Sequence, residues 1–313
     1  RYFVSASVRT DGSSKFKNVS DRWGWFWSLG GAWRISNEEW IKDASWLTDL
    51  KLRADYGTTG NQSGIGNYAG YTTWGYAATG WLNSGASMPS GWKLTQNAMA
   101  NSSLTWETKK TWDVGLDFRL WDRFYGTIDW YRSMTDDMLW NVPMSIEKGQ
   151  TTIAANSAKM KTWGIEFDLG VDIIKTPDIL WSFSVNGGHY KSTIANTPEG
   201  VGDPKLNNCW TATSDAWSMS GVGGGAGIIY LRGEGKPYYN IYQVRYMGVD
   251  QTTGLPLYSH YVTAAEATAG TFGSAKEGDL VGTTNYSIAD RVELGDATPD
   301  FIGGFSTSFT YQN

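Results

Sequence analysis

The sequence predicts an all-β fold, an antiparallel transmembrane β-barrel segment with long extracellular loops. Long segments of the 313-residue chain alternate apolar and polar side chains with a period of two, which is typical of strands with two different faces. Short turns and long loops separate these segments in alternation, as in outer-membrane barrels. No run of 18 apolar residues occurs, so a β-barrel is the one way in which this sequence could span a membrane.

Two segments show the alternation most clearly. In residues 112–120 every second side chain is apolar, and Asp, Gly or Arg lies between; residues 163–173 repeat the pattern with Gly, Glu and Asp. No charged residue occupies an apolar position in either segment. Weaker copies predict further strands within residues 2–8, 25–33, 50–56, 126–130, 181–185 and 301–309.

The length of the alternation favours a membrane barrel over a β-sandwich. Ten residue steps from Trp163 to Ile173, at about 3.4 Å each and a tilt of about 40°, cover about 26 Å, close to the ~25 Å apolar band of outer-membrane barrels. Sandwich strands usually have about 5 or 6 residues. The polar positions also carry too many carboxylates for a packed core, where each would need a partner, whereas a water-filled barrel needs none.

The connections predict the orientation of the barrel. Residues 121–123 and 175–178 form tight turns, whereas 57–103, 140–157 and 194–236 are long and rich in Gly, Ser, Asn and Trp. Outer-membrane barrels have short periplasmic turns and long extracellular loops. Within one longer periplasmic connection, residues 36–39 (SNEE) before Trp40 predict a capped helix of one or two turns.

Composition excludes several classes of function. With 26 Lys and Arg against 31 Asp and Glu, the net charge is −5, so no basic surface is expected for nucleic acid. A single cysteine and two histidines exclude a Cys/His zinc site, and no cofactor or metal is predicted. The 46 Trp, Tyr and Phe residues instead indicate an ordered, aromatic-rich surface.

The two ends of the chain lie inside predicted strands. Residues 1–9 form a strand with no charged leader or cleavage site before them, and the alternation after Phe301 continues almost to Asn313. We therefore expect that processing has removed a leader or that the chain is a fragment.

Short motifs occur in a characteristic order along nearly the whole chain. The first are residues 9–16 (RTDGSSKF), 31–36 (GAWRIS) with Glu39, 50–53 (LKLR), 56–57 (YG) and 59–62 (TGNQ). The later ones are Leu104, 106–107 (WE), 115–117 (GLD), 248–250 (GVD) with 253–254 (TG), 290–291 (DR), Gly295, 298–299 (TP) and 303–305 (GGF). In order and spacing the chain resembles the barrel of SusC/RagA-type TonB-dependent outer-membrane transporters, except that Trp27 stands where the family usually has proline.

This resemblance implies a plugged barrel of about 22 strands, of which residues 1–313 supply some eight to ten as a partial barrel. It implies that the plug domain, the TonB box and the closing strands lie outside this chain. Implied partners are a SusD/RagB-like surface lipoprotein as lid, the TonB complex acting through the missing N-terminal region, and outer-membrane lipid. Transporter and lipoprotein are expected to double into a dimer of pairs in the outer membrane of a Gram-negative bacterium.

Aromatic side chains in the predicted loops are the candidate ligand-binding residues. Sugar rings present flat C–H faces that stack on Trp and Tyr. The alternative is that these rings pack loop against loop or against the lid protein; Trp121 and Phe124, beside a periplasmic turn, fit the interfacial aromatic girdle better. The candidates are Trp74, Tyr76, Trp81, Trp92, Trp210, Trp217, Tyr238 and Tyr239.

No catalytic residues are predicted. Alternate carboxylates such as Asp113, Asp117, Glu166 and Asp168 could form the acid and base of a glycoside hydrolase, but a hydrated or plug-facing wall explains them better. The chain lacks the motifs of serine, phosphate-binding and zinc-hydrolase sites. Residues 250–254 (DQTTG) lack the closing Glu of a calcium loop and predict a hairpin turn.

The leading hypothesis is therefore outer-membrane import of oligosaccharides, energised by TonB. A peptide importer of the same family is the first alternative, because an aromatic surface does not exclude peptides. A secreted, aromatic-rich β-sandwich that binds ligands without transport is the second. Its strands would lose the apolar alternation after about three residues, whereas here it runs for five or six.

Overall fold

The structure, a computed structural model, describes residues 1–78, 92–150, 152–198, 209–213 and 228–311. The chain divides into two compact units, which are described separately. Unit 1 comprises residues 1–201 and 299–313, and unit 2 comprises residues 202–298. None of the helices in the described ranges is both long enough and apolar enough to cross a membrane.

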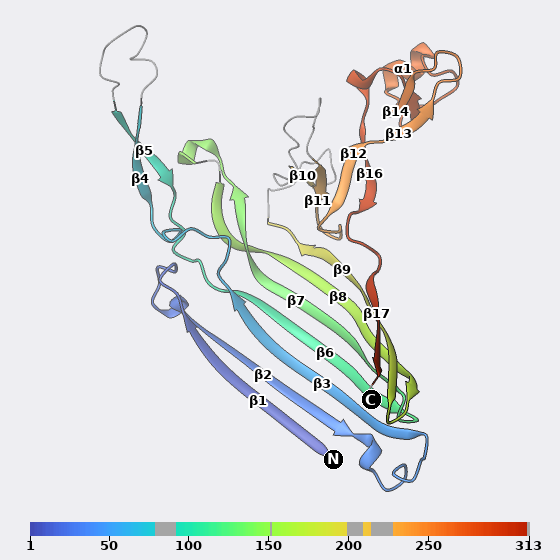
Figure 1. The fold of residues 1–313 in the computed structure, drawn as a ribbon. Helices are drawn as coiled ribbons and strands as arrows, with labels where there is room; N and C mark the ends of the chain where they lie inside the picture. The colour runs from blue at the N-terminus through green and yellow to red at the C-terminus, as the bar shows by residue number, and fades with distance from the viewer. Residues whose placement is uncertain (79–91, 151, 199–208, 214–227, 312–313) are drawn as a thin grey trace. The chain divides into compact units, whose positions relative to one another are not determined.

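Unit 1 is built on one eight-stranded antiparallel sheet (Figure 1). Seven of its strands follow one another along the chain, and the eighth, β17, adds to β9 after unit 2. In sheet order the strands are β1 (Tyr2–Gly12), β2 (Trp23–Arg34), β3 (Leu47–Asn61), β6 (Glu107–Leu120), β7 (Phe124–Pro143), β8 (Thr152–Lys175), β9 (Ile179–Asn196) and β17 (Ile302–Tyr311). Every segment predicted from the alternation lies in this sheet.

The strand register joins the apolar positions of neighbouring strands into one continuous face. Ala54 pairs with Val114, Val114 with Trp130, and Trp130 with Ile165. Since paired residues point to the same side of a sheet, one face is apolar from β3 to β8. Beyond these strands the apolar face continues through Val4, Val8, Trp25, Trp27 and Leu29 on one side and Val185, Phe183, Phe305 and Phe309 on the other.

The opposite face is polar and charged. Asp55 pairs with Asp113, Gly115 with Asp129, and Asp129 with Glu166. The apolar face is widely exposed, with Val4 and Phe305 both at 80%, an arrangement that requires a nonaqueous cover. The eight strands have 10 to 24 residues, enough for the 9 to 11 that a tilted strand needs to cross a bilayer.

The tight turns lie where the sequence predicted them. Trp121 and Asp122 both adopt positive φ, 48° and 57°, as the two central residues of a type I′ turn do. The rings of Trp121 and Phe124 meet edge to face at 6.1 Å, and both side chains are about half exposed, which suits the interfacial position expected of them. At the second turn, the amide of Thr176 donates to the carbonyl of Ile179.

The capped helix expected at residues 36–39 is replaced by a 3₁₀ turn. The helix covers Ile35–Asn37, and no side chain caps it. Ser36 donates its hydroxyl proton to Asp49, and Glu38 accepts hydrogen bonds from Tyr2 and Trp33. The polar residues that suggested a cap therefore bind neighbouring strands instead.

Two predicted long loops contain more strand than expected. β7 and β8 continue into residues 140–157 and leave residues 144–151 between them, with a 3₁₀ turn at Ile146–Lys148. The hairpin of β4 (Thr73–Ala78) and β5 (Trp92–Ala98) lies within residues 57–103. The sequences of these segments do not show the long apolar alternation, so they were not predicted as strands.

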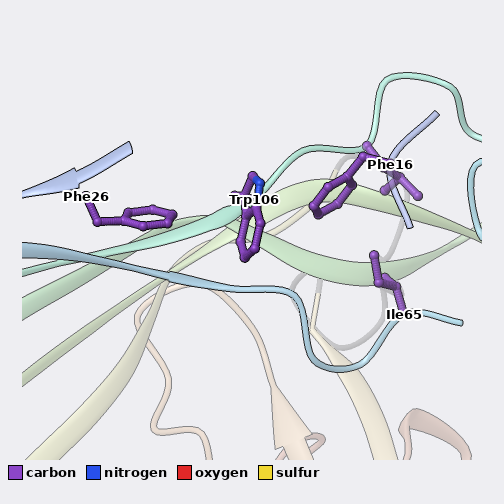
Figure 2. Packing of buried hydrophobic residues seen from close by; sticks show 5 residues of the cluster. Phe16, Phe26, Ile65 and Trp106 are labelled. Atoms are coloured by element: carbon purple, nitrogen blue, oxygen red, sulfur yellow. The ribbon is translucent and has the colours of Figure 1, made fainter. Parts of the chain in front are cut away.

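A small core holds together the connections at one end of the sheet. Phe16, Phe26, Ile65, Leu104 and Trp106 are all buried (Figure 2). The ring of Trp106 lies 5.4 Å from that of Phe16 and 5.7 Å from that of Phe26. A Cβ at Gly60 would collide with the ring of Phe26, so glycine is needed there for close packing.

Polar contacts join the same motif segments. Ser13 donates to the side chain of Gln62, and Lys15 donates to the carbonyls of Gln62 and Ile65. Asn61 donates to Glu107 at 3.2 Å. Three motifs that are far apart in the sequence, residues 9–16, 59–62 and 106–107, thus meet at one place.

Unit 2 contains two small antiparallel sheets. The first joins β10 (Trp210–Thr213), β11 (Ile229–Arg232), β12 (Asn240–Val244) and β16 (Arg291–Asp296), and the second joins β13 (Tyr246–Val249), β14 (Pro256–Tyr261) and β15 (Leu280–Thr283). A short helix, α1 (Ala264–Ala269), follows β14, and Tyr286–Ile288 form a 3₁₀ turn. The described strands β10 and β11 lie within residues 194–236, which the sequence predicted as loop. They have four residues each, too few for the alternation to be visible.

The hairpin turn predicted at residues 250–254 is confirmed. Asp250 accepts hydrogen bonds from the amides of Thr252 and Thr253, and Gly254 has a φ of 72°. Val249 pairs with Pro256 across the turn. The side chain of Asp250 thus stabilises the turn through hydrogen bonds to its backbone. These hydrogen bonds lower the pKa of the Asp250 carboxyl group.

Ile165→Arg tests the assignment of the apolar face. In the full-length protein folded into lipid vesicles, we expect the free energy of unfolding to fall by about 2–4 kcal/mol, because a guanidinium would face hydrocarbon. The matched control is Asn186→Arg on the polar face, where Asp168 is the paired residue; it should stay within about 0.5 kcal/mol of wild type. Urea titration followed by heat-dependent gel mobility measures both, and equal losses would contradict the assignment.

Leu104→Ala tests the small buried cluster of Phe16, Phe26, Ile65, Leu104 and Trp106, which we call the motif core. Leu104 is fully buried, so truncation should cost about 2–5 kcal/mol and speed proteolysis of residues 99–106 in the folded protein. Val19, which is 69% exposed, provides the control: Val19→Ala should change neither measurement. Unchanged proteolysis of the Leu104→Ala protein would mean that the core does not hold these connections.

Candidate functional site

The structure places six of the eight predicted aromatic residues and brings them together in two groups. Trp81 and Trp217 lie outside the described residues. Trp74, Tyr76 and Trp92 belong to the β4–β5 hairpin, where Ala78 pairs with Trp92 and Tyr76 with Leu94; the side chain of Trp74 is 58% exposed. Trp210, Tyr238 and Tyr239 belong to the four-stranded sheet of unit 2 and its connections.

In unit 2, an arginine that the sequence analysis did not select contacts two tyrosine rings, and a third tyrosine packs against both of these rings. We call Tyr230, Arg232, Tyr238 and Tyr239 the tyrosine–arginine cluster. The Tyr239 ring meets the rings of Tyr238 and Tyr230 edge to face, at 4.9 and 5.6 Å. The guanidinium carbon of Arg232 lies 4.1 Å from the centre of the Tyr238 ring and 5.9 Å from that of Tyr230, within range of a cation–π interaction.

A tight turn after β11 produces this arrangement. Gly235 adopts a φ of 78°, a conformation that favours glycine, and the amide of Lys236 donates to the carbonyl of Gly233. The chain reverses, so that Arg232 Nε donates to the carbonyl of Tyr238 at 3.3 Å. The backbone of Trp210 pairs with Arg232 on the other side. A glycine-rich turn between short aromatic strands was the sequence signal that could have identified Tyr230 and Arg232.

The residues of the cluster differ in exposure. Tyr230 is buried, Tyr238 and Arg232 are partly buried, and Tyr239 is 44% exposed. The buried ring fixes the exposed one, which lowers the entropy lost when a flat ligand stacks on it. An aromatic surface with a fixed cation can bind sugar rings, planar amides and anions.

The polar face of the large sheet carries a charge network. Arg53 Nε donates to both oxygens of Asp117 at 3.0 and 3.1 Å, and its Nη2 donates to Asp129 at 2.7 Å. Lys51 lies 3.5 Å from Asp117. Ion pairs thus connect β3, β6 and β7 on this face. Because Arg53 occupies two of the carboxylates, the arrangement suits a hydrated wall better than acid–base catalysis.

A buried histidine lies between two carboxylates in unit 2. His260 Nδ1 is 2.8 Å from Asp290, and Nε2 is 2.9 Å from Glu266. Burial alone would lower the pKa of His260, but these hydrogen bonds outweigh it and raise the pKa. The amide of Thr263, with His260 and the Thr263 hydroxyl, lowers the pKa of Glu266 to about 2. The contact between His260 and Glu266 connects β14 to α1.

Ser259, His260 and Asp290 do not form a hydrolytic triad. The Ser259 hydroxyl donates to the backbone carbonyl of Asp290 and accepts from the amide of Arg245, so it makes no bond to the imidazole. It is also fully buried, where no substrate reaches it. Among the described residues there is no group of three or more His, Cys, Asp and Glu side chains able to hold a metal ion.

Comparison with known proteins identifies the family. Residues 1–308 match the family model described as TonB dependent receptor-like, beta-barrel. The chain belongs to this family. The predicted fold class and the resemblance to SusC/RagA-type barrels are thereby confirmed, and the alternative of a secreted β-sandwich module is wrong.

Individual proteins that are similar to this TonB-dependent receptor barrel support the same family. TonB-dependent receptor P3 of Formosa agariphila is 30% identical over the whole chain, and TonB-dependent receptor SusC of Bacteroides thetaiotaomicron is 35% identical over 59% of it. The RagAB peptide importer in its closed-closed state is similar in structure over 99% of the chain, with a TM-score of 0.73 and 26% identity. The chain spans less than a third of these relatives, 29% of P3, 18% of SusC by the matched region and 30% of the RagAB chain.

The histidine pair predicts a pH dependence. The raised pKa of His260 gives a stabilising contribution that is complete below pH 6.5 and is lost as the pH rises through the raised value. The contribution of Glu266 is present above pH 4.5 and is lost as the pH falls towards 2. Hydrogen exchange in β14, corrected for the intrinsic rate, should therefore be slowest near pH 5–6.

The variant His260→Gln isolates the upper half of this dependence. It should remove the loss of protection that the wild-type protein shows as the pH rises above 6.5, while exchange in β6 of unit 1 provides an internal control. Protection of β14 that stays constant over this range in the wild-type protein would contradict the ion pair.

Proposed function

We propose that this chain is part of the barrel of an outer-membrane transporter that imports oligosaccharides through a plugged pore, energised by TonB. The observation that supports it best is the sheet with two different faces. One face is apolar and exposed, and on the other face Arg53 forms ion pairs with Asp117 and Asp129. The family match and the relative SusC agree with a TonB-dependent role. The exposed rings of Trp74 and Tyr239 are surfaces suited to sugar stacking.

The full-length protein would work with partners outside this chain. We propose a SusD/RagB-like surface lipoprotein as lid over the long extracellular connections and the TonB complex on the periplasmic side. Transporter and lipoprotein would assemble as a dimer of pairs. Residues 1–313 would form one partial barrel in this assembly, with the connection that contains unit 2 on the extracellular side, since the tight turns at 121–123 and 175–178 mark the other side.

Peptide import is the second candidate. The structurally similar RagAB is a peptide importer, and the register places Asp55 beside Asp113 on the polar face, a pairing that suits cationic groups. Deleting the gene and testing growth on single oligosaccharides and on peptides separates the two candidates. Loss of growth on a glycan alone supports the first, and loss on peptides alone overturns it.

Tyr239→Ala tests the stacking surface. We expect the affinity of the purified full-length transporter for the oligosaccharide on which growth depends to fall about 2- to 12-fold, the equivalent of the 0.5–1.5 kcal/mol of an aromatic contact. Tyr246→Ala is the matched control, because Tyr246 is 59% exposed but lies on the other sheet of unit 2. Calorimetry measures both, and equal affinities for wild type and Tyr239→Ala would remove the cluster from the binding site.

A further inference from the structure

We infer that Arg232 binds a carboxylate group of the cargo and that the tyrosine–arginine cluster therefore selects acidic oligomers over neutral ones. This inference deepens the proposed function and rests on it. The ligand chemistry is a carboxylate beside a flat, partly apolar unit. A uronic acid within a glycan and a carboxyl group of a peptide both provide it.

The first argument is that the guanidinium is held in place before any ligand arrives. It lies 4.1 Å from the centre of the Tyr238 ring, and its Nε is fixed by the carbonyl of Tyr238. Tyr239 supports the Tyr238 ring edge to face. A fixed planar fork loses little entropy on binding, which is the condition under which arginine recognises carboxylates well.

The second argument is that the charge of Arg232 is not matched within the described residues. Glu293, on the same sheet, is occupied by Lys236 at 2.6 Å and by Asn240 at 2.9 Å. Those contacts lower the pKa of Glu293 and keep it ionised. Arg232 itself makes no ion pair with any carboxylate that the structure describes; Lys236 forms such a pair and Arg232 does not.

The third argument concerns which donors remain. The Nε proton of Arg232 is used by Tyr238, and within the part of the chain that the structure describes the two Nη groups remain to meet a ligand. Two parallel N–H donors match the two oxygens of a carboxylate. A single guanidinium also balances one negative charge, which fits a carboxylate better than a doubly charged phosphate. The partly buried position beside Tyr230 strengthens such a pair relative to one in open water.

The neighbouring aromatic residues match the rest of such a ligand. Tyr239, 44% exposed, offers a ring at the edge of the cluster, and the backbone of Trp210 pairs with that of Arg232. A ligand could therefore present its carboxylate to Arg232 and its flat face to Tyr239. The Arg232 guanidinium and the Tyr239 ring together would select a ligand that carries both a carboxylate and a flat face.

The test uses the full-length transporter in detergent and four probes of matched length. They are a galacturonic-acid oligosaccharide, a neutral galactose oligosaccharide, a peptide with a free terminal carboxylate and the same peptide with a terminal amide. Wild-type protein should bind at least one carboxylated probe about 10-fold more tightly than its neutral counterpart. Calorimetry at low and at 0.5 M salt measures the affinities, and salt should weaken the carboxylated probe more.

Three variants separate binding from structure. Arg232→Gln should abolish the preference for the carboxylated probe and leave the neutral probe unaffected, and Arg232→Lys, which keeps the charge but loses the fork, should keep only part of it. Tyr238→Leu should weaken the preference because the guanidinium loses its support. Arg291→Gln, on strand β16 of the same sheet, is the matched control and should keep the full preference. Heat-dependent gel mobility confirms folding.

Each outcome has one meaning. Wild-type protein that shows no preference for carboxylates overturns the inference, and so does an Arg232→Gln protein that keeps the preference or loses both probes equally. Binding of neutral oligosaccharide without any preference leaves the proposed glycan import standing while the inference fails. An Arg232-dependent preference confined to the peptide probes supports the inference and removes the glycan proposal.

Discussion

Hydrogen bonding between neighbouring strands in one fixed register is the constraint on which the rest of unit 1 depends. A slip of one residue in any pair would move every apolar side chain of that strand to the charged face. The pairing of Trp130 with Ile165 and of Asp129 with Glu166 shows that the register keeps the two kinds of side chain apart. Lipid on one side and water on the other are compatible with this sheet only because the separation extends over all eight strands.

The motif core explains why residues far apart in the sequence belong together. Phe16, Ile65 and Leu104 come from three different connections, yet they share one buried cluster, and Gly60 leaves the space that the Phe26 ring needs. A sheet with two solvated or lipid-covered faces has no interior of its own. The cluster provides a local core where strands end and connections begin, so these connections leave the sheet at defined positions.

The strands of the large sheet could be predicted from the sequence because period-two alternation is a local signal. Residues 112–120 and 163–173 each show two distinct faces within their own sequence, and the turn at 121–123 follows from the short gap between residues 112–120 and 126–130. The expected helix at 36–39 is absent because Ser36 and Glu38 bind Asp49, Tyr2 and Trp33, which lie on three different strands of the sheet. The four-residue strands of unit 2 were missed because they are shorter than the pattern that reveals a strand.

The candidate site was predictable only in part, for a related reason. Aromatic richness pointed to Tyr238 and Tyr239, but composition says nothing about which rings meet. Arg232 became visible only when the turn at Gly235 brought it against Tyr238. Nothing in its own sequence distinguishes Arg232, and its role follows from the Tyr238 ring that holds it and from the lack of a carboxylate partner among the described residues.

The position of unit 2 between two paired strands has a consequence for how such proteins diversify. Strands β9 and β17 lie side by side, with Gly188 opposite Ile302, although the whole of unit 2 separates them in the chain. The pairing of β9 with β17 keeps the sheet continuous across the intervening segment, and the entropy of closing such a segment rises only slowly with its length. Insertions and replacements between β9 and β17 are therefore compatible with the same eight-stranded sheet.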